Sequence, residues 1–91
     1  MQTIIDARWP LFVKVADIGS VSGAAVALDI PQSVVSRQIA QLESEAGSRL
    51  FRRTGRGVVL TEYGEQVYPR IVALIAQADQ LADDMAGRHP C

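Results

Sequence analysis

The chain has 91 residues, of which 48% are hydrophobic and 5% aromatic, and its formal net charge is −1. This length allows one small domain with a modest core and excludes a second domain of ordinary size. The sequence contains no apolar run long enough for a transmembrane helix and no basic leader, so we expect a cytoplasmic protein without membrane contact. Because Cys91 is the only cysteine and His89 the only histidine, we expect no disulfide, no metal site and no cofactor.

The positive charge is concentrated in the middle of the chain. Residues 37–56 contain five arginines against two glutamates, whereas acidic residues outnumber basic ones in residues 1–36 and 57–91. Phosphate groups respond to the local field of a basic patch. A total charge near zero therefore does not exclude nucleic acid as a partner.

The first expected helix covers Asp6 to Ala16, and its regular part is expected to begin near Pro10, because proline is tolerated only in a first helical turn. Its apolar residues recur at helical spacing and define one face. These residues are Trp9, Phe12, Val13 and Ala16.

A short second helix is expected from Val21 to Leu28, with the Ser20 hydroxyl accepting a hydrogen bond from its first turn. Glycine and alanine dominate this helix, which predicts that another helix packs very close to it. After a turn at residues 29–31, a third helix is expected from Pro31 to Ala46, with Pro31 at its first position.

The third helix has two faces of different character. Its apolar residues follow the spacing i, i+4, i+7 and i+11 and are expected to face the core. They are Val35, Ile39, Leu42 and Ala46. The opposite face is polar near the N-terminus and is expected to be exposed. It consists of Gln32, Ser33, Ser36, Arg37 and Ala40.

Short apolar runs at residues 50–51 and 58–60 flank a segment rich in arginine and glycine, which predicts a two-stranded hairpin. The segment reads Arg52-Arg53-Thr54-Gly55-Arg56-Gly57. We interpret it as a basic wing, in which the glycines let the backbone approach DNA. Its arginines can contact phosphates or enter a minor groove.

Thr61 is expected to cap a last helix from Glu62 to Ala86, and Pro69 inside this helix is expected to bend it. An apolar stripe along the helix has the heptad spacing of a coiled coil. It consists of Val67, Ile71, Leu74, Ala78, Leu81 and Met85. Burial against the same helix of a second chain would remove the stripe from water, which predicts a homodimer. The alternative is that the stripe packs back on the first helix, and some residues could do both.

Two short helices joined by a tight turn, from about residue 21 to residue 40, form a helix-turn-helix, whose second helix fits the major groove of DNA. Gln32 can pair with adenine and Arg37 with guanine, while Ser33 and Ser36 can bind bases or phosphates. Taken alone, these side chains fit a solvated helix face at least as well. The basic wing favours DNA, because it supplies the electrostatic anchoring that a recognition helix needs.

A set of residues spread over about positions 5–85 forms a continuous pattern without gaps. It comprises Phe12-Val13, Ala16, Gly19-Ser20, Ala24-Ala25, Leu28, Gln32 to Ile39, Leu42-Glu43, Gly47, Arg49-Leu50-Phe51, Arg53-Thr54, Leu60-Thr61 and Gly64. This pattern closely resembles the N-terminal signature of the bacterial LysR-type transcriptional regulators. The resemblance implies a mainly α fold, a winged helix-turn-helix of three helices plus a two-stranded wing, followed by a long dimerisation helix.

The resemblance also implies which positions contact DNA. They are Gln32, Ser33, Ser36 and Arg37 in the recognition helix and Arg53 in the wing, with Thr54 and Arg56 as neighbours. The family commonly has serine before the glutamine and proline after it, where this chain has Pro31 and Ser33. Because Pro31 has no hydroxyl, we expect the cap of the third helix to come from elsewhere, such as Asp29. The base preference at the Ser33 position stays open.

We divide the chain into a winged helix-turn-helix domain at residues 1–61, with the wing at about 50–60, a linker and dimerisation helix at 62–86, and a terminal segment at 87–91. The expected function is transcription regulation by a dimer bound to a partly palindromic double-stranded DNA operator. A higher oligomer stays open for a longer chain. In the family, a small-molecule effector binds a C-terminal domain, which we expect to be absent here.

An enzyme is not expected, because no nucleophile with a base, no pair of carboxylates and no metal site can be assembled from these residues. The remaining alternative is a helical, dimeric protein-interaction module that uses the basic wing to bind an acidic protein. The polar, groove-sized outer face of the third helix favours DNA.

Overall fold

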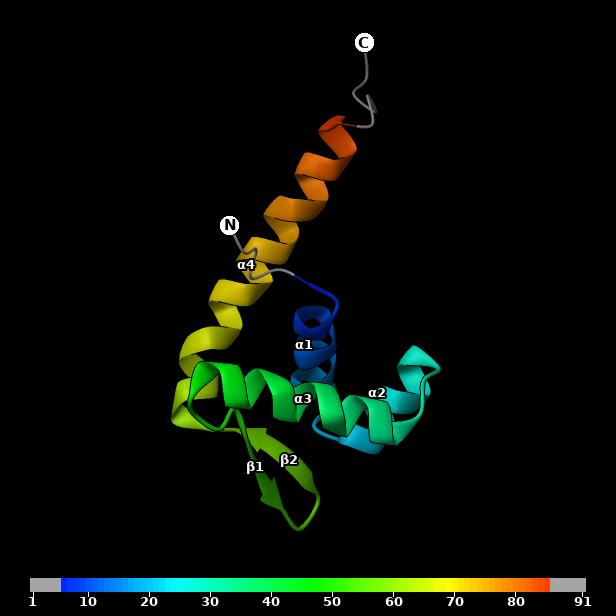
Figure 1. The fold of residues 1–91 in the computed structure, drawn as a ribbon, viewed down its shortest axis with the longest axis vertical. Helices are drawn as coiled ribbons and strands as arrows, with labels where there is room; N and C mark the ends of the chain where they lie inside the picture. The colour runs from blue at the N-terminus through cyan, green and yellow to red at the C-terminus, as the bar shows by residue number, and fades with distance from the viewer. Residues whose placement is uncertain (1–5, 86–91) are drawn as a thin grey trace.

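The computed structural model describes residues 6–85 as four helices and a two-stranded antiparallel sheet. The elements are α1 (Arg8–Ile18), α2 (Val21–Leu28), α3 (Gln32–Ala46), β1 (Phe51–Thr54), β2 (Gly57–Leu60) and α4 (Glu62–Met85). The first three helices and the hairpin form a body, from which α4 extends as a long arm (Figure 1). None of the helices within residues 6–85 is both long and apolar enough to cross a membrane. The predicted order of elements is confirmed.

The ends of α1 differ from the prediction for local reasons. The helix begins at Arg8, which places Pro10 inside the first turn, where its missing N–H removes no intrahelical hydrogen bond. It continues past Ala16 to Ile18 and stops at Gly19, whose φ of 77° is left-handed. Glycine adopts this conformation without steric cost, so it ends the helix.

The start of α3 corrects the expected cap. Pro31 precedes the helix as its N-cap residue, and its carbonyl accepts a hydrogen bond from the N–H of Val34. No side chain caps α3. The expected cap by Asp29 is wrong, because Asp29 ends α2 in a left-handed conformation with φ of 57°. Aspartate tolerates this conformation better than most residues.

The other two predicted side-chain caps are present. The Ser20 hydroxyl accepts a hydrogen bond from the N–H of Gly23 at 2.9 Å, at the start of α2. The Thr61 hydroxyl accepts one from the N–H of Gly64 at 3.0 Å, at the start of α4. The predicted helix end at Ala86 lies outside the described residues, and α4 is one continuous helix through Pro69.

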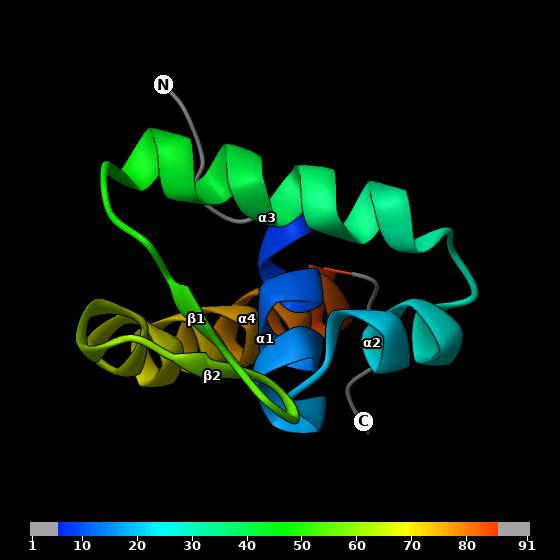
Figure 2. The ribbon, with the colours of Figure 1, turned by 90° about the horizontal axis from the view of Figure 1, so that it is seen from below.

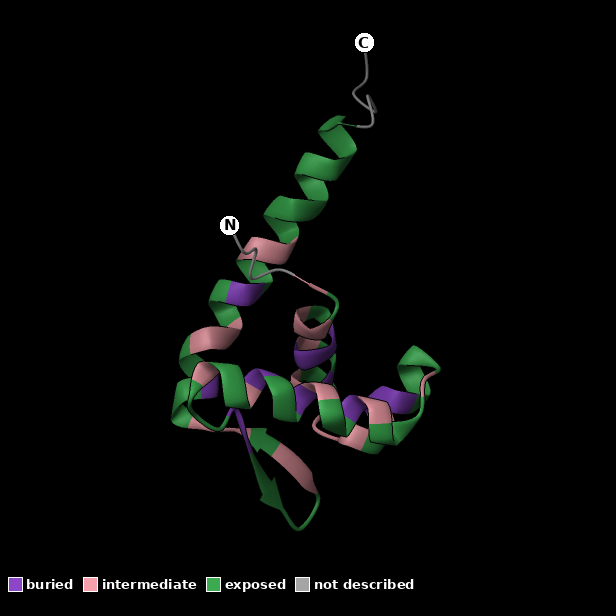
Figure 3. Cartoon of the chain, viewed as in Figure 1, coloured by how far each residue is buried: buried purple, intermediate pink, exposed green. Residues whose placement is uncertain are grey.

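The core lies where α1, α2, α3 and the base of the hairpin meet the first half of α4 (Figure 3). Its buried apolar residues are Leu11, Phe12, Val15, Ala24, Ala25, Val35, Ile39, Leu42, Leu50, Phe51 and Ile71. The α1 residues in this set show that its inner face is displaced from the predicted stripe, of which only Phe12 is fully buried. The buried alanines of α2 agree with the close helix packing expected from its composition.

Arg8 connects the start of α1 to the end of α3. Its guanidinium lies 2.9 Å from the Asp6 carboxylate and 2.7 Å from the Glu45 carboxylate. Hydrogen bonds from Arg8 lower the pKa of both carboxyl groups below their usual values. Because the Glu45 side chain is largely exposed, this ion pair contributes little to the stability of the fold.

Candidate nucleic-acid interface

The outer face of α3 presents the side chains that the sequence predicts for base recognition. Gln32, Ser33, Ser36 and Arg37 are all exposed, whereas Val35, Ile39 and Leu42 on the opposite face are buried. The first turn of α3 contains no acidic residue, so nothing in it offsets the positive end of the helix dipole. This end of the helix therefore favours a negatively charged partner.

The hairpin is the predicted wing. Its strands pair Phe51 with Leu60 and Arg53 with Val58, and the exposed basic side chains of Arg52, Arg53 and Arg56 lie on or beside β1. Thr54 is also exposed. Seen from below, the hairpin passes in front of α1 and α4, and a loop joins β1 to the end of α3 along the upper edge of the view (Figure 2).

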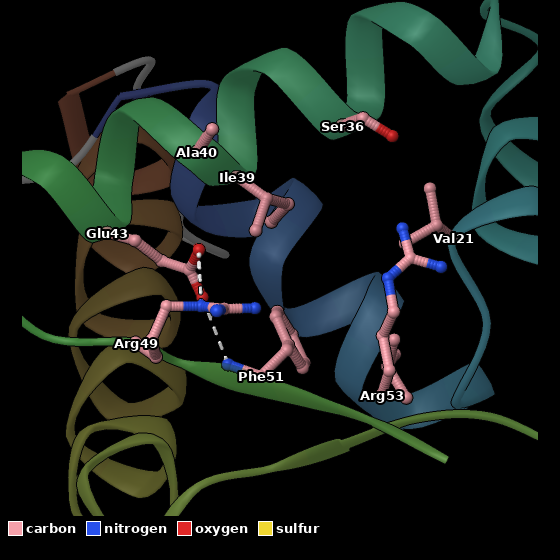
Figure 4. A pocket seen from close by; sticks show the side chains of 9 residues that line it. Val21, Ser36, Ile39, Ala40, Glu43, Arg49, Phe51 and Arg53 are labelled. Carbon is pink, nitrogen blue, oxygen red and sulfur yellow. Dashed lines mark hydrogen bonds and ion pairs between the residues drawn. The ribbon is translucent and has the colours of Figure 1, made fainter. Parts of the chain in front are cut away.

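A cavity separates the wing from α3 and receives side chains from both elements (Figure 4). It is lined by Val21, Ser36, Ile39, Ala40, Glu43, Arg49, Phe51, Arg53 and Val58. Arg53 reaches from β1 towards Ser36 and Val21 (Figure 4). The structure thus brings together two predicted DNA contacts that lie far apart in the sequence. Gln32 instead lines a second cavity beside the turn between α2 and α3.

Two sets of contacts hold the wing on the body, and a third closes the base of the hairpin. The Glu43 carboxylate accepts hydrogen bonds from the N–H groups of Leu50 at 2.7 Å and Phe51 at 3.1 Å. The Val58 N–H donates to the Gly19 carbonyl at 3.0 Å, where α1 meets α2. The Thr61 hydroxyl donates to the Arg49 carbonyl at 2.7 Å. These contacts fix the wing relative to α3.

Two residues that help to place the wing, Glu43 and Gly57, have no such role in the sequence prediction. The sequence prediction uses Glu43 only as a charge and as part of a family pattern. The signal available for it is an acid next to inward-facing Leu42, within a segment in which five arginines outnumber two glutamates. Gly57 was assigned to close approach by DNA, but its Cα faces its own chain: a Cβ there would lie 2.2 Å from the Gly19 carbonyl oxygen.

The apolar stripe of α4 is divided into two halves. Ile71 belongs to the core and is 3% exposed, and Val67 and Leu74 pack against the same core. Beyond them Ala78 is exposed, and Leu81 and Met85 are 58% and 79% exposed. The first half therefore packs on the body of its own chain, as the alternative reading of the stripe expected, and the second half is uncovered.

Tyr68 connects α4 to α1. Its hydroxyl donates a hydrogen bond to the Asp17 carboxylate on α1. This bond raises the pKa of the Tyr68 hydroxyl above its usual value. The Tyr68 ring lies 6.4 Å from the ring of Phe12, so the same residue also packs on the core.

No group of three or more histidine, cysteine, aspartate or glutamate residues within positions 6–85 could hold a metal ion. The uncovered polar and basic groups of α3 and the wing are suited to hydrogen bonding and charge neutralisation. Such groups match the phosphates and base edges of a nucleic acid.

A family model for the bacterial regulatory helix-turn-helix proteins of the lysR family matches residues 8–65. The chain belongs to this family. It is 42% identical over 73 residues to the nitrogen assimilation regulatory protein nac of Escherichia coli, covering 80% of this chain and 24% of that protein. It is 46% identical over 68 residues to the transcriptional regulator GalR of Pseudomonas putida, covering 75% of this chain and 17% of that protein.

The solved structures agree with this membership in the LysR family. The DNA complex of the BenM DBD with benA site 1 has a TM-score of 0.82 and 36% identity, covering 89% of this chain and 93% of that chain. The LysR family regulator CbnR has a TM-score of 0.83 and 28% identity, covering 87% of this chain and 27% of that chain. These matches confirm the predicted winged helix-turn-helix fold and its family. The nac relative is named as a regulatory protein and GalR as a transcriptional regulator, in agreement with the prediction of a regulatory domain and not an enzyme.

Proposed function

We propose that this chain is the DNA-binding part of a LysR-type transcriptional regulator, which acts in the cytoplasm on a partly palindromic operator. The observation that carries the proposal is the meeting of Ser36 on α3 and Arg53 on the wing at one cavity. Gln32 and Arg37 are exposed on the same helix as Ser36. The similarity to DBD–DNA complexes of BenM and CbnR supports the same function.

Within this proposal the two elements have different roles. Gln32, Ser33, Ser36 and Arg37 enter the major groove and contact base edges and nearby phosphates, because α3 offers them on its exposed face. The wing binds the sugar-phosphate backbone through Arg53, with Thr54 and Arg56 beside it. The salt dependence of binding then reports mainly on the wing.

The chain spans about a quarter or less of the length of the curated relatives it matches. We therefore assign effector binding, and any assembly beyond a dimer, to parts of such a regulator other than this domain. The domain supplies DNA recognition and one dimer contact.

Replacement of Arg37 and replacement of Arg53 should change DNA binding in different ways. Arg37→Ala should cost about 1–3 kcal/mol on an operator selected from random duplexes and relax the preference at one base pair per half-site. Arg53→Ala should weaken operator and scrambled duplex alike and lower the salt slope by about one unit per protomer, because one phosphate contact is lost. Salt titrations of both variants on both duplexes measure these effects.

The parent protein provides the control for this pair, because its affinity for random DNA must itself fall steeply with salt. If the parent protein does not bind duplex DNA at low salt, the proposed function is contradicted and an acidic protein partner is favoured. If Arg37→Ala weakens both duplexes equally while Arg53→Ala alters the preferred sequence, the roles of helix and wing are reversed.

The proposed dimer contact is the uncovered half of the α4 stripe, at Ala78, Leu81 and Met85. Leu81→Glu should convert the dimer to a monomer, because it places two charges in one apolar contact. Sedimentation at on the order of tens of micromolar protein measures the change. Ala76→Glu, at an exposed position on another side of α4, is the matched control and should leave the dimer intact. A Leu81→Glu variant that stays dimeric would place the contact elsewhere.

A further inference from the structure

The recognition helix and the wing face each other along the cavity between them. On α3, Ser36, Ala40 and Glu43 line one side, because residues at this spacing share a helix face. On β1, Phe51 and Arg53 line the other side, because alternate residues of a strand share a face. Glu43 and Phe51 therefore lie at one end of this cavity. Ser36 and Arg53 lie at the end proposed to meet DNA (Figure 4).

One oxygen of the Glu43 carboxylate holds the base of the wing. Its Oε2 atom accepts hydrogen bonds from the backbone N–H of Leu50 at 2.7 Å and of Phe51 at 3.1 Å. The other oxygen, Oε1, lies 3.3 Å from Nε of Arg49, and the Glu43 side chain is only 14% exposed. Water therefore competes weakly for the two N–H groups, and the carboxylate is their main partner.

We propose that Glu43 is a positioning residue for DNA binding, which sets the place and direction of the Arg53 guanidinium relative to α3. The proposal rests on the DNA-binding function proposed above. A hairpin with strands of four residues is marginal by itself, so its direction depends on what anchors its base. Because Phe51 and Arg53 share a face of β1, fixing the Phe51 backbone also fixes the side on which Arg53 emerges.

A purely electrostatic role for Glu43 predicts the opposite behaviour. A carboxylate beside a basic surface repels DNA phosphates, so removal of its charge should strengthen binding if only the field matters. If Glu43 acts as an anchor, the requirement is an acceptor oxygen that reaches the N–H groups of Leu50 and Phe51. The charge and the length of the side chain can be varied separately at position 43.

The test uses the 91-residue chain and a fluorescein-labelled random-sequence duplex, titrated over a series of NaCl concentrations. Glu43→Asp keeps the charge but shortens the side chain, so its carboxylate no longer reaches both N–H groups. We expect about tenfold weaker binding and a salt slope smaller by about one unit per protomer. Glu43→Gln loses the charge but keeps one oxygen able to accept both bonds, so its binding should equal or exceed that of the parent.

A double-mutant cycle distinguishes positioning of Arg53 from general destabilisation. In the Arg53→Ala background, Glu43→Asp should change the affinity by less than about twofold, because the arginine it positions is already gone. Glu45→Gln, which changes the charge equally but does not touch the wing, is the matched control for Glu43→Gln. Circular dichroism follows folding, and Glu43→Ala takes the place of Glu43→Asp if the latter unfolds.

Each outcome decides the matter. Additive effects of Glu43→Asp and Arg53→Ala, or equal weakening by Glu43→Asp and Glu43→Gln, overturn the positioning role while leaving DNA binding intact. Unfolding of both the aspartate and alanine variants also overturns it, since Glu43 would then stabilise the whole fold. A parent chain that does not bind the duplex contradicts the proposed function itself.

Discussion

Replacing Phe12 by alanine is expected to lower the free energy of unfolding by about 3–5 kcal/mol. The side chain is fully buried, and its ring lies 5.6 Å from Trp9, 5.4 Å from Phe51 and 6.4 Å from Tyr68. One ring therefore packs α1 against both β1 and α4. Its removal leaves a cavity at the point where the three elements meet, so the wing and the arm should loosen together.

Urea unfolding followed by circular dichroism measures this loss. Val26→Ala, at an exposed position on α2, is the control and should stay within about 0.5 kcal/mol of the parent. Because a domain of this size has little stability to lose, Phe12→Leu provides an intermediate variant that keeps part of the apolar contact. Equal midpoints for Phe12→Ala and Val26→Ala would mean that the core is not centred on this residue.

Local periodicity is sufficient to predict α3 and the hairpin. The buried and exposed faces of α3 follow directly from its spacing, because a helix fixes which residues point the same way. The hairpin follows from two apolar runs around glycines. The cap of α3 could not be predicted from composition. Asp29 is a suitable capping residue by type, but it ends α2 in a left-handed conformation and does not cap α3.

The apolar stripe of α4 shows a limit of the same reasoning. Periodicity identifies a face that must be covered, but it does not identify the partner that covers it. Ile71 is covered by the chain's own core, whereas Leu81 is uncovered. The difference arises because the body beside α4 ends partway along the helix (Figure 1). A sequence pattern carries no information about that length.

The position of the wing depends on contacts between residues distant in the sequence, which local patterns do not encode. Val58 bonds the carbonyl of Gly19, and Glu43 bonds the start of β1. From sequence, Gly55 and Gly57 are equivalent turn glycines. In the structure nothing lies within 4 Å of a Cβ built on Gly55, whereas a Cβ on Gly57 would meet backbone atoms.

Gly57→Ala is therefore expected to destabilise the protein by about 2–5 kcal/mol, whereas Gly55→Ala should change its stability by no more than about 0.5 kcal/mol. Two effects combine at Gly57. Its φ of 151° disfavours any side chain, and a Cβ would lie 2.2 Å from the Gly19 carbonyl oxygen. Because that oxygen is backbone, the wing itself must move.

The movement should break the hydrogen bond from Val58 to Gly19 and displace Arg53, which pairs with Val58 across the hairpin. Urea unfolding measures the loss of stability, and a salt titration on random duplex DNA measures the loss of the wing contact as a smaller slope. Gly55→Ala carries the same added methyl group two residues away and isolates the effect of position. If both variants unfold at the same urea concentration, the wing is not held by its contact with Gly19, and the close approach at Gly57 does not determine where Arg53 lies.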